Sequence, residues 1–202
     1  MKLYYAPGAC WMTPHIVLNE LGLPYEAVKV DLKTKTVAGG DSFVKINPKG
    51  YVPAIELDDG RHLTEVAAIV LYLADLKPEA GLAPANGTFE RYQLVEWLTF
   101  ISSEIHKGMG TLFNPTVSPD WRQASIDRLN NRFDWLSKQL DGKPYLMGDA
   151  FTIADAYLFN ILSWARLVKF DLDPWPTLGD YAGRIGARPA VIETLKSEGL
   201  LR

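Results

Sequence analysis

The hydrophobic pattern of this chain changes once, near residue 78. Before that point, short runs in which apolar and polar residues alternate are separated by segments whose apolar residues recur at helical spacing. After residue 88 every apolar pattern has helical spacing. A chain of 202 residues is long enough for two small domains. We therefore predict an α/β domain over residues 1–77, a linker over 78–87 and an all-α helical bundle domain over 88–202.

The first domain contains two groups of elements. The pattern predicts a strand at 3–6, a helix at 14–21, a strand at 26–31, strands at 52–57 and 62–64, and a helix at 67–73. The first two strands are expected to be parallel, since a helix joins them. The dipeptide Asp59-Gly60 favours a hairpin, and Pro78 requires the last helix to end before it. The order β-α-β, β-β-α is that of a thioredoxin-like domain.

The second domain reads as helices throughout. The pattern predicts helices at 92–101, 119–140 and 153–168, and further helices from about 177 and 189. Ser118 is a suitable N-cap, with Pro119 at the first helical position. Thr152 and Asp155 have the spacing of a capping box, in which the shorter Asp weakens the return bond. The segment 153–168 is apolar all round, which predicts a central place in the bundle.

Charge and composition exclude several classes of protein. The 21 basic and 24 acidic residues leave none of the basic excess that nucleic acids attract. No apolar run approaches the roughly 18 residues that a membrane helix needs, and Pro7-Gly8 precedes any signal-peptide core, so we expect a cytoplasmic protein. The single Cys10 excludes an internal disulfide, a dithiol pair and a cysteine-rich zinc site. Because His15, His62 and His106 show no ligand spacing, we expect no metal.

Cys10 follows a predicted strand and turn and stands just ahead of a helix. Backbone N–H groups and the helix dipole stabilise an anion at such a place. A thiol with a pKa of about 8.5 is only about 3% ionised at pH 7, and lowering that pKa to about 7 needs roughly 2 kcal/mol. The same position suits the thiolate or carboxylate of another molecule. The alternative is that Cys10 is a small buried hydrophobic residue.

Three further features each have a functional and a purely structural interpretation. Val52-Pro53 lies in a strand-like run. In the functional interpretation the peptide bond is cis and turns the Val52 backbone toward a peptide ligand. In the structural interpretation Pro53 is an ordinary proline of an edge strand. Glu65 stands at the start of a helix. In the functional interpretation it binds an α-amino acid group together with the free N–H groups there. In the structural interpretation its charge only interacts favourably with the helix dipole. The run from Ser103 to Lys107 gathers a hydroxyl, a carboxylate, an imidazole and an amine, but also fits a solvated face with a structural His106.

Taken together, these residues resemble the cytosolic glutathione S-transferases, and within them the bacterial beta class. The resemblance covers the whole chain. It is carried by Met1-Lys2-Leu3-Tyr4-Tyr5 with Pro7-Gly8-Ala9-Cys10, Asn47-Pro48-Lys49-Gly50-Tyr51-Val52-Pro53-Ala54, Leu63-Thr64-Glu65, Tyr72-Leu73-Ala74-Asp75, Ser103-Glu104-Ile105-His106 and Thr152-Ile153-Ala154-Asp155. It implies a thioredoxin-like domain that binds glutathione, a helical domain that forms most of the acceptor pocket, and a homodimer.

The resemblance also implies the roles of individual residues. Cys10 would lie beside the glutathione sulfur, as a hydrogen-bond donor or a mixed-disulfide partner, and His106 would approach the same sulfur as the second catalytic residue. The other implied glutathione contacts are Val52 beside a cis Pro53 at the cysteinyl backbone, Glu65 and the Val66 amide at the γ-glutamyl end, Lys35 and Lys107 at the glycine carboxylate, Ser103 and Glu104 reaching the neighbouring subunit's glutathione, and Tyr5 lining the pocket.

Four positions depart from the family pattern. Trp11 stands where a small residue is usual, so we expect it to narrow the acceptor pocket or to stack on an aromatic acceptor. Thr99 replaces a common amide side chain in the glutathione site and would remove one contact across the dimer. Val66 and Ala67 replace more usual residues, although a backbone amide at 66 survives that change.

The function that the resemblance implies is attack by bound glutathione thiolate on a small hydrophobic electrophile. The protein would then be a detoxifying transferase with glutathione as co-substrate and no cofactor, and with no nucleic-acid or membrane partner. One alternative is a glutathione-dependent thiol enzyme, such as a reductive dehalogenase or mixed-disulfide reductase, that uses Cys10 covalently. The other is a non-catalytic family member that binds hydrophobic ligands or proteins.

Overall fold

The computed structural model describes residues 1–201, which form two compact units. The first contains Met1–Ala80 together with the segment that begins at Pro189, and the second contains Gly81–Arg188. The apolar pattern predicts that residues 88–202 form the helical domain, whereas the contacts group the last helix with the first unit. The reason lies in polar side chains: Thr194 and Glu198 both bond to groups near the start of the chain.

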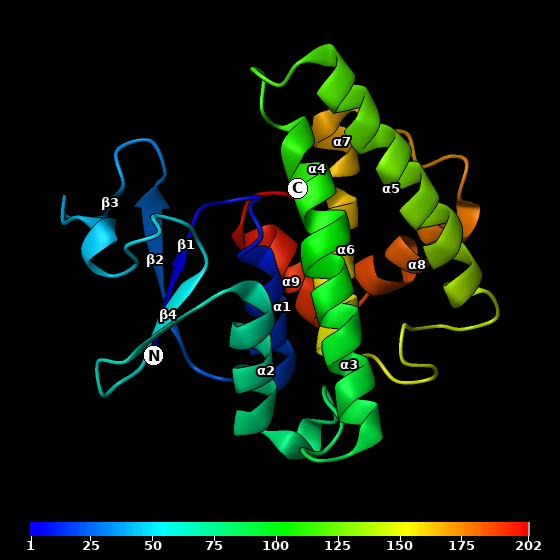
Figure 1. Cartoon of the computed structure of the whole chain (residues 1–202). Helices are drawn as coiled ribbons and strands as arrows, with labels where there is room; N and C mark the ends of the chain where they lie inside the picture. Colours follow the sequence, from blue (N-terminus) through cyan, green and yellow to red (C-terminus); the bar gives the residue numbers. More distant parts are fainter. Residues whose placement is uncertain (202) are drawn as a thin grey trace. The chain divides into compact units, whose positions relative to one another are not determined.

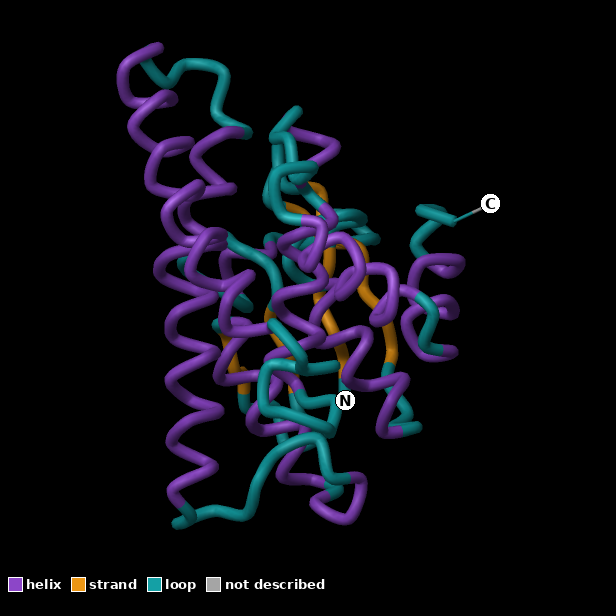
Figure 2. The backbone as a smooth tube through the Cα atoms, turned by 90° about the vertical axis from the view of Figure 1, so that its right-hand side faces the viewer, coloured by secondary structure: helices purple, strands orange, loops and turns teal. Residues whose placement is uncertain are grey.

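The first unit is built on a mixed five-stranded sheet, visible as the orange segments in Figure 2. Its strands are β1 (Lys2–Tyr5), β2 (Glu26–Asp31), β3 (Thr36–Val37), β4 (Ala54–Glu56) and β5 (His62–Thr64). The strand order is β3-β2-β1-β4-β5, with β1 parallel to β2 and antiparallel to β4. The predicted strands and the hairpin are confirmed. The two-residue β3 was not predicted, because its polar surroundings carry no strand pattern.

Three α-helices belong to this unit, namely α1 (Met12–Leu21), α2 (Val66–Leu76) and α9 (Pro189–Ser197). Helix α1 packs against both α2 and α9 (Figure 1). It ends at Gly22, whose φ of 62° is the left-handed conformation that glycine adopts at helix C-termini. Short 3₁₀ turns occur at Phe43–Lys45 and Pro78–Ala80.

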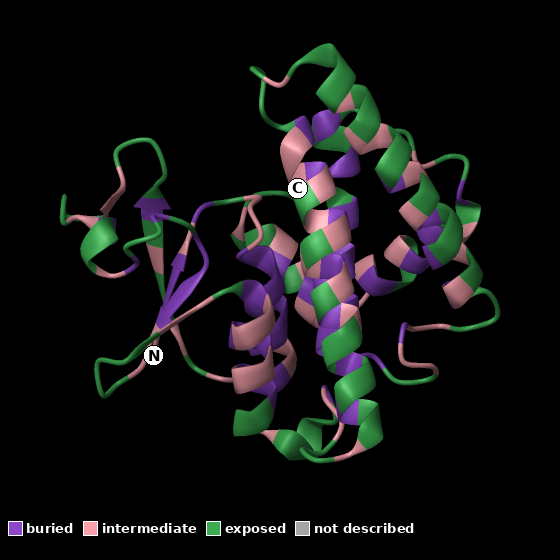
Figure 3. Cartoon of the chain, viewed as in Figure 1, coloured by how far each residue is buried: buried purple, intermediate pink, exposed green. Residues whose placement is uncertain are grey.

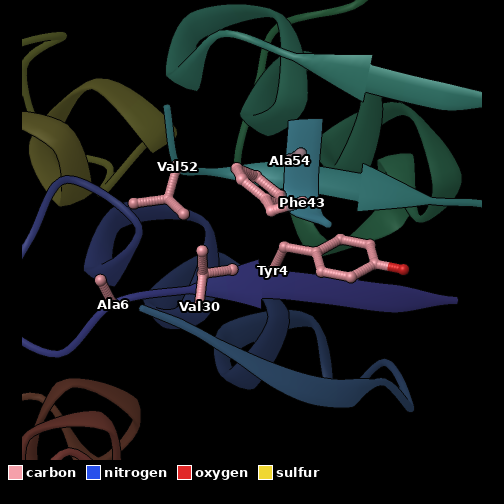
Figure 4. Packing of buried hydrophobic residues seen from close by; sticks show 6 residues of the cluster. All are labelled: Tyr4, Ala6, Val30, Phe43, Val52 and Ala54. Atoms are coloured by element: carbon pink, nitrogen blue, oxygen red, sulfur yellow. The ribbon is translucent and has the colours of Figure 1, made fainter. Parts of the chain in front are cut away.

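A hydrophobic cluster packs on the sheet and includes a residue that the sequence analysis assigns to the functional site. Figure 4 shows its six buried members, Tyr4, Ala6, Val30, Phe43, Val52 and Ala54. The rings of Tyr4 and Phe43 lie 5.7 Å apart, within the range of favourable aromatic pairs. Burial of the Val52 side chain fixes the position of the backbone just ahead of β4.

The second unit is helical. Its elements are α3 (Phe89–Phe100), a π-helix (Ile101–His106), α4 (Lys107–Leu112), α5 (Pro119–Leu140), α6 (Ile153–Ser163), α7 (Ala165–Val168) and α8 (Pro176–Gly186). The helix predicted to end near residue 101 continues to Leu112, and the one predicted over 153–168 breaks at Trp164. Helix α6 is buried almost throughout, as predicted, whereas α5 is largely exposed, shown in green in Figure 3. Within residues 1–201 no helix has the length and apolar character required to cross a membrane.

The capping box at the start of α6 is confirmed. The Thr152 N–H donates to the Asp155 carboxylate at 2.8 Å, so the shorter side chain does not weaken the return bond. The same buried carboxylate accepts the Leu146 N–H at 2.8 Å and the Tyr181 hydroxyl at 2.9 Å. Burial raises the pKa of Asp155, and these donors oppose that shift. Asp155 therefore ties α8 and the preceding loop to the first turn of α6.

Glu104 links the π-helix to α5. Its carboxylate accepts from Arg132 Nε at 2.8 Å and from Arg128 Nη2 at 3.0 Å, and its side chain is 23% exposed. The hydrogen bond from Arg132, followed by the one from Arg128, holds the pKa of Glu104 below its usual value. Glu104 is therefore an anion that joins two helices at neutral pH.

This linkage predicts a pH-dependent effect of Glu104→Gln. The lowered folded-state pKa means that ionised Glu104 contributes stability above its ordinary pKa of 4.5 and that this contribution disappears as the pH falls through the folded-state value. Urea unfolding of the wild type and the variant should therefore show a difference at pH 7 that shrinks below about pH 4.5. Glu96→Gln, on an exposed residue of α3, is the matched control. A difference that is constant with pH would contradict this role for the ion pairs.

Candidate functional site

Cys10 lies in the turn between β1 and α1, as the sequence predicts. The turn passes through Gly8 with a φ of 72°, a left-handed conformation that glycine adopts readily. The Cys10 carbonyl already accepts the Thr13 N–H at 3.3 Å, so the residue stands at the threshold of α1. Its burial is intermediate. Cys10 is therefore not the fully buried hydrophobic residue of the alternative interpretation.

The Cys10 thiol donates a hydrogen bond to the Val52 carbonyl, with Sγ and O 3.2 Å apart. The Val52–Pro53 peptide bond is cis, which agrees with the first of the two interpretations of this proline. A thiol can donate to a carbonyl whereas a thiolate cannot, so this contact belongs to the protonated form of Cys10. Deprotonation or the arrival of a better acceptor would break it.

A buried asparagine shapes the loop that carries Val52. Asn47 is 2% exposed, and its Nδ2 donates to the Tyr51 carbonyl at 2.6 Å. Its Oδ1 accepts the Lys49 N–H at 3.2 Å, and its own carbonyl accepts the Gly50 N–H at 2.8 Å. The Asn-Pro-Lys-Gly pattern marks the turn, but it does not reveal that the side chain is its internal support.

The same loop brings the predicted residues of the first unit together. Lys35 Nζ donates to the Gly50 carbonyl at 2.8 Å, and Lys49 forms an ion pair with Glu65. With the bond from Cys10 to Val52, the loop over residues 47–53 contacts residues from three separate parts of the unit. Lys49 is a member of this group that sequence reasoning missed, because a lysine in a polar turn looks like solvent-exposed charge.

Glu65 has an unusual backbone conformation directly ahead of α2. Its φ is 74°, an unfavourable value for a residue with a side chain, and such strain is concentrated at functional sites. The Glu65 side chain makes no capping bond to α2 and is 69% exposed. The carboxylate therefore does not act as a helix cap. It pairs with Lys49 and is accessible to a ligand, while Glu65 itself directly precedes Val66, the first residue of the helix.

Trp11 lies in a different environment from the one predicted for it. The side chain is 1% exposed, with its ring centroid 4.2 Å from that of Tyr5 and 4.5 Å from that of His15. The buried Nε1 has no hydrogen-bond partner among residues 1–201. This burial differs from the expected position in an acceptor pocket, and it places the bulk of Trp11 between Tyr5 and the inner face of α1.

His106 is held by aromatic side chains of the second unit. Its Nδ1 lies 2.7 Å from the Tyr157 hydroxyl, and its ring meets that of Trp164 edge-on with centroids 5.0 Å apart. Tyr157 is buried on α6, so it restricts the orientation of the imidazole. The sequence analysis reads this stretch of α6 only as core. An apolar helix that contains one tyrosine hydroxyl was the available signal, since a buried hydroxyl needs a partner.

The other predicted residues of this unit lie on or beside the π-helix. Ser103 Oγ donates to the Thr99 carbonyl at 2.9 Å and Thr99 Oγ1 to the Val95 carbonyl at 2.8 Å, so both hydroxyls bond back to their own helix. Lys107 is the first residue of α4. Short π-helical segments occur frequently at functional sites, which supports the functional interpretation of Ser103–Lys107 over the solvated face. The approach of His106 to Cys10 stays a prediction from the resemblance.

Among residues 1–201, no cluster of three His, Cys, Asp or Glu side chains is arranged to hold a metal ion. The arrangement in the first unit offers instead one thiol, an exposed carboxylate at a helix start, and a loop whose backbone carries polar contacts. These groups suit a peptide-like thiol ligand with a charged end, because each can pair with one part of such a molecule.

Comparison with known proteins places the chain in a family. Residues 10–76 match the glutathione S-transferase N-terminal domain, and residues 119–184 match the C-terminal domain of the same proteins. The glutathione S-transferase GstA of Escherichia coli O157:H7 is 40% identical over 200 residues, which cover 99% of this chain and all of the relative.

Solved structures agree. BphK, a bacterial glutathione S-transferase solved as a ternary complex, is 53% identical with a TM-score of 0.98, and the match covers 99% of this chain and 100% of BphK. The beta-class enzyme of Sphingomonas chungbukensis is 48% identical with a TM-score of 0.95, and both chains are covered completely. The chain therefore belongs to the glutathione S-transferases, in their bacterial beta class.

Proposed function

We propose that this protein is a glutathione transferase that joins glutathione, as its thiolate, to small hydrophobic electrophiles. The observation that carries the proposal is the Cys10 thiol at the start of α1, hydrogen-bonded at 3.2 Å to Val52 beside the cis Pro53. A partly exposed thiol donor and a strand-like backbone segment stand next to each other there. A cysteinyl peptide ligand has both the sulfur and the backbone to engage them.

Activation of the glutathione sulfur is the chemical step. In the proposed mechanism, the Cys10 thiol breaks its hydrogen bond to the Val52 carbonyl and donates a hydrogen bond to the glutathione thiolate instead. The N-terminal end of α1 also stabilises the thiolate. The resemblance assigns His106, oriented by Tyr157, to the same sulfur. Lowering the glutathione pKa by one to two units raises the thiolate fraction at pH 7 by about tenfold or more. Holding the electrophile beside the sulfur adds a proximity effect.

Charged groups at the two ends of glutathione supply binding and orientation. Glu65 and the Val66 amide hold the α-amino and α-carboxylate groups of the γ-glutamyl end, with Lys49 next to Glu65. The resemblance assigns Lys35 and Lys107 to the glycine carboxylate. The Val52 backbone pairs with the cysteinyl residue between them, and Tyr5 lines the site. The side chain of Trp11 acts through its contacts with Tyr5 rather than on the acceptor.

We further propose a cytoplasmic homodimer that needs no cofactor beyond glutathione as co-substrate. Thr99 and Ser103 are exposed and Glu104 is partly exposed, and the resemblance directs Ser103 and Glu104 to the neighbouring subunit's glutathione. Sedimentation velocity should give twice the chain mass of 22.6 kDa. A monomer with full conjugation activity would contradict a shared site.

Titration of glutathione into the purified protein by calorimetry, with a chloronitrobenzene conjugation assay on the same sample, tests the function. We expect saturable binding and turnover. Glu65→Gln should weaken binding about tenfold or more, because a hydrogen bond to a charged group contributes about 1.5–3 kcal/mol. Glu26→Gln, an exposed carboxylate on β2, is the matched control. Absence of binding at millimolar glutathione would favour a protein that carries hydrophobic ligands or binds other proteins.

Replacement of the single cysteine distinguishes conjugation from covalent thiol chemistry. Cys10→Ser retains a hydroxyl donor, so conjugation should continue at a rate lowered by about tenfold, the range of one weakened hydrogen bond. Reductive dehalogenation or mixed-disulfide reduction through Cys10 would disappear entirely. A pH–rate profile of the wild type that coincides with that of free glutathione would rule out activation of the thiol by this protein.

A further inference from the structure

A cavity of about 610 Å³ opens in the first unit at the carboxyl ends of β1 and β2, and the described residues that line it take no part in the proposed glutathione site. The two strands are parallel, with Tyr5 opposite Lys29, so their carboxyl ends lie side by side. Ligands of α/β sheets commonly bind outside the carboxyl ends of the strands. Because cavities of about 300–1,000 Å³ hold small organic ligands, the size and the place of this cavity suit such a molecule.

One wall of the cavity is continuous with the sulfur site. Ala6, which lines the cavity, packs in the same buried cluster as Val52, whose carbonyl accepts the hydrogen bond from the Cys10 thiol. Figure 4 shows Ala6, Val30 and Val52 together at one end of that cluster. The Ala6 carbonyl also accepts the Ala9 N–H at 3.2 Å, within the turn that leads to Cys10. A molecule in the cavity therefore lies next to the turn at which the glutathione sulfur is proposed to bind.

The cavity combines an apolar wall with cationic groups. Leu32 and Val37 contribute aliphatic side chains, and Leu32 is 38% exposed although it is a large apolar residue. Lys29 and Lys33 line the same cavity and are also exposed. Among residues 1–201 neither ammonium takes part in an ion pair, so each can attract an anion. An aromatic ring with an anionic substituent would contact the apolar wall and the cations at once.

One carboxylate lines the cavity as well, but it is engaged in its own turn. Asp31 Oδ1 accepts the Lys33 N–H at 2.8 Å and the Thr34 N–H at 3.2 Å. These bonds hold the turn that follows β2. Two ammonium groups against one carboxylate leave the cavity with a net positive charge. That charge favours an anionic ligand over a neutral one of the same shape.

We propose that this cavity is an acceptor subsite that selects small aromatic electrophiles carrying a carboxylate or a similar anionic group. The inference deepens the proposed transferase function and rests on it. The ring packs on the apolar wall, its anionic group faces Lys29 and Lys33, and the carbon under attack faces the glutathione sulfur. With a chloronitrobenzoate, the thiolate forms a C–S bond to the ring carbon that holds chlorine, and the C–Cl bond breaks as chloride leaves with the electron pair.

Two acceptors that differ in charge alone test this selection. A chloronitrobenzoate and the corresponding chloronitrobenzamide share the leaving group, so the ratio of their kcat/KM values, each divided by the rate with free glutathione, reports selection by the protein. We expect the wild type to favour the benzoate about threefold or more. Lys29→Gln and Lys33→Gln should each lower the ratio by about threefold, the range of an exposed ion pair. Asp31→Asn removes the one opposing charge and should raise it. An increase in salt from about 0.05 to about 0.5 M should lower the wild-type ratio.

The matched control is Lys45→Gln, which removes an exposed lysine of the same unit that lies outside the cavity. Its ratio should equal that of the wild type. An equal decrease in Lys45→Gln would mean that the general surface potential causes the preference, and it would overturn the proposal. The KM for glutathione gives a second check. If Lys29→Gln and Lys33→Gln raise that KM and leave the ratio unchanged, the two lysines bind glutathione, and the proposal is again overturned.

Binding of an unreactive analogue separates this proposal from the transferase function. Nitrobenzoate lacks the chloride leaving group, so it binds without reacting. In NMR titrations of isotope-labelled protein we expect the amide signals of residues 29–38 to shift with nitrobenzoate, and the affinity to fall about threefold in Lys33→Gln. If these shifts appear but no acceptor is conjugated, the transferase proposal fails while the cavity is confirmed as a site for aromatic anions. If the wild type conjugates glutathione but nitrobenzoate leaves these signals unchanged, the subsite proposal alone is overturned.

Discussion

The hydrogen bond from the Cys10 thiol to the Val52 carbonyl connects the reactive end of α1 to the hydrophobic core of the first unit. Val52 has two roles at once, because its side chain is buried in the cluster on the sheet while its carbonyl faces the thiol. The packing of Phe43 and Tyr4 therefore determines where the thiol acceptor lies. The geometry of the chemical site depends on sheet packing, and not on the loop alone.

Buried polar residues place the remaining backbone segments. Asn47 supports the loop before β4, Glu198 holds the Gly8 turn, and Asp155 joins a loop and α8 to the start of α6. Each has backbone N–H groups or carbonyls as partners, so the loss of any one side chain removes hydrogen bonds that hold a backbone segment in place. In this protein polar side chains fix the loops, and apolar side chains hold the helices and strands around them.

The sequence predicts the fold well where the pattern is local. Strand–turn–helix at Cys10, the hairpin at Asp59-Gly60 and the capping box at Thr152 all follow from residue type and spacing. The π-helix does not, because the apolar residues Ile101 and Ile105 stand four apart, as they would in an α-helix. Nor can local patterns show that α9 packs on α1, since a long-range pairing of helices leaves no periodic signal in either one.

The candidate site residues likewise differ in whether a local pattern of the sequence reveals them. Cys10 and Glu65 stand at helix starts after strands, which is a local signal. Lys49, Tyr157 and Glu198 act through partners far away in the sequence, and no spacing reports that. The Glu198 carboxylate looks like surface charge near the end of the chain. Only the pairing of α1 with α9 turns it into a buried group behind the thiol.

Trp11 shows how a large side chain beside Cys10 is compatible with this arrangement. Its buried Nε1 without a partner costs about 1–3 kcal/mol. Burial of roughly 200 Å² of indole surface at about 25 cal/mol per Å² contributes about 5 kcal/mol, so burial outweighs the unpaired donor. The ring then occupies the space between Tyr5 and His15 and restrains both. A small residue at this position would remove both ring contacts, so in this chain an aromatic contact as well as a carboxylate holds His15.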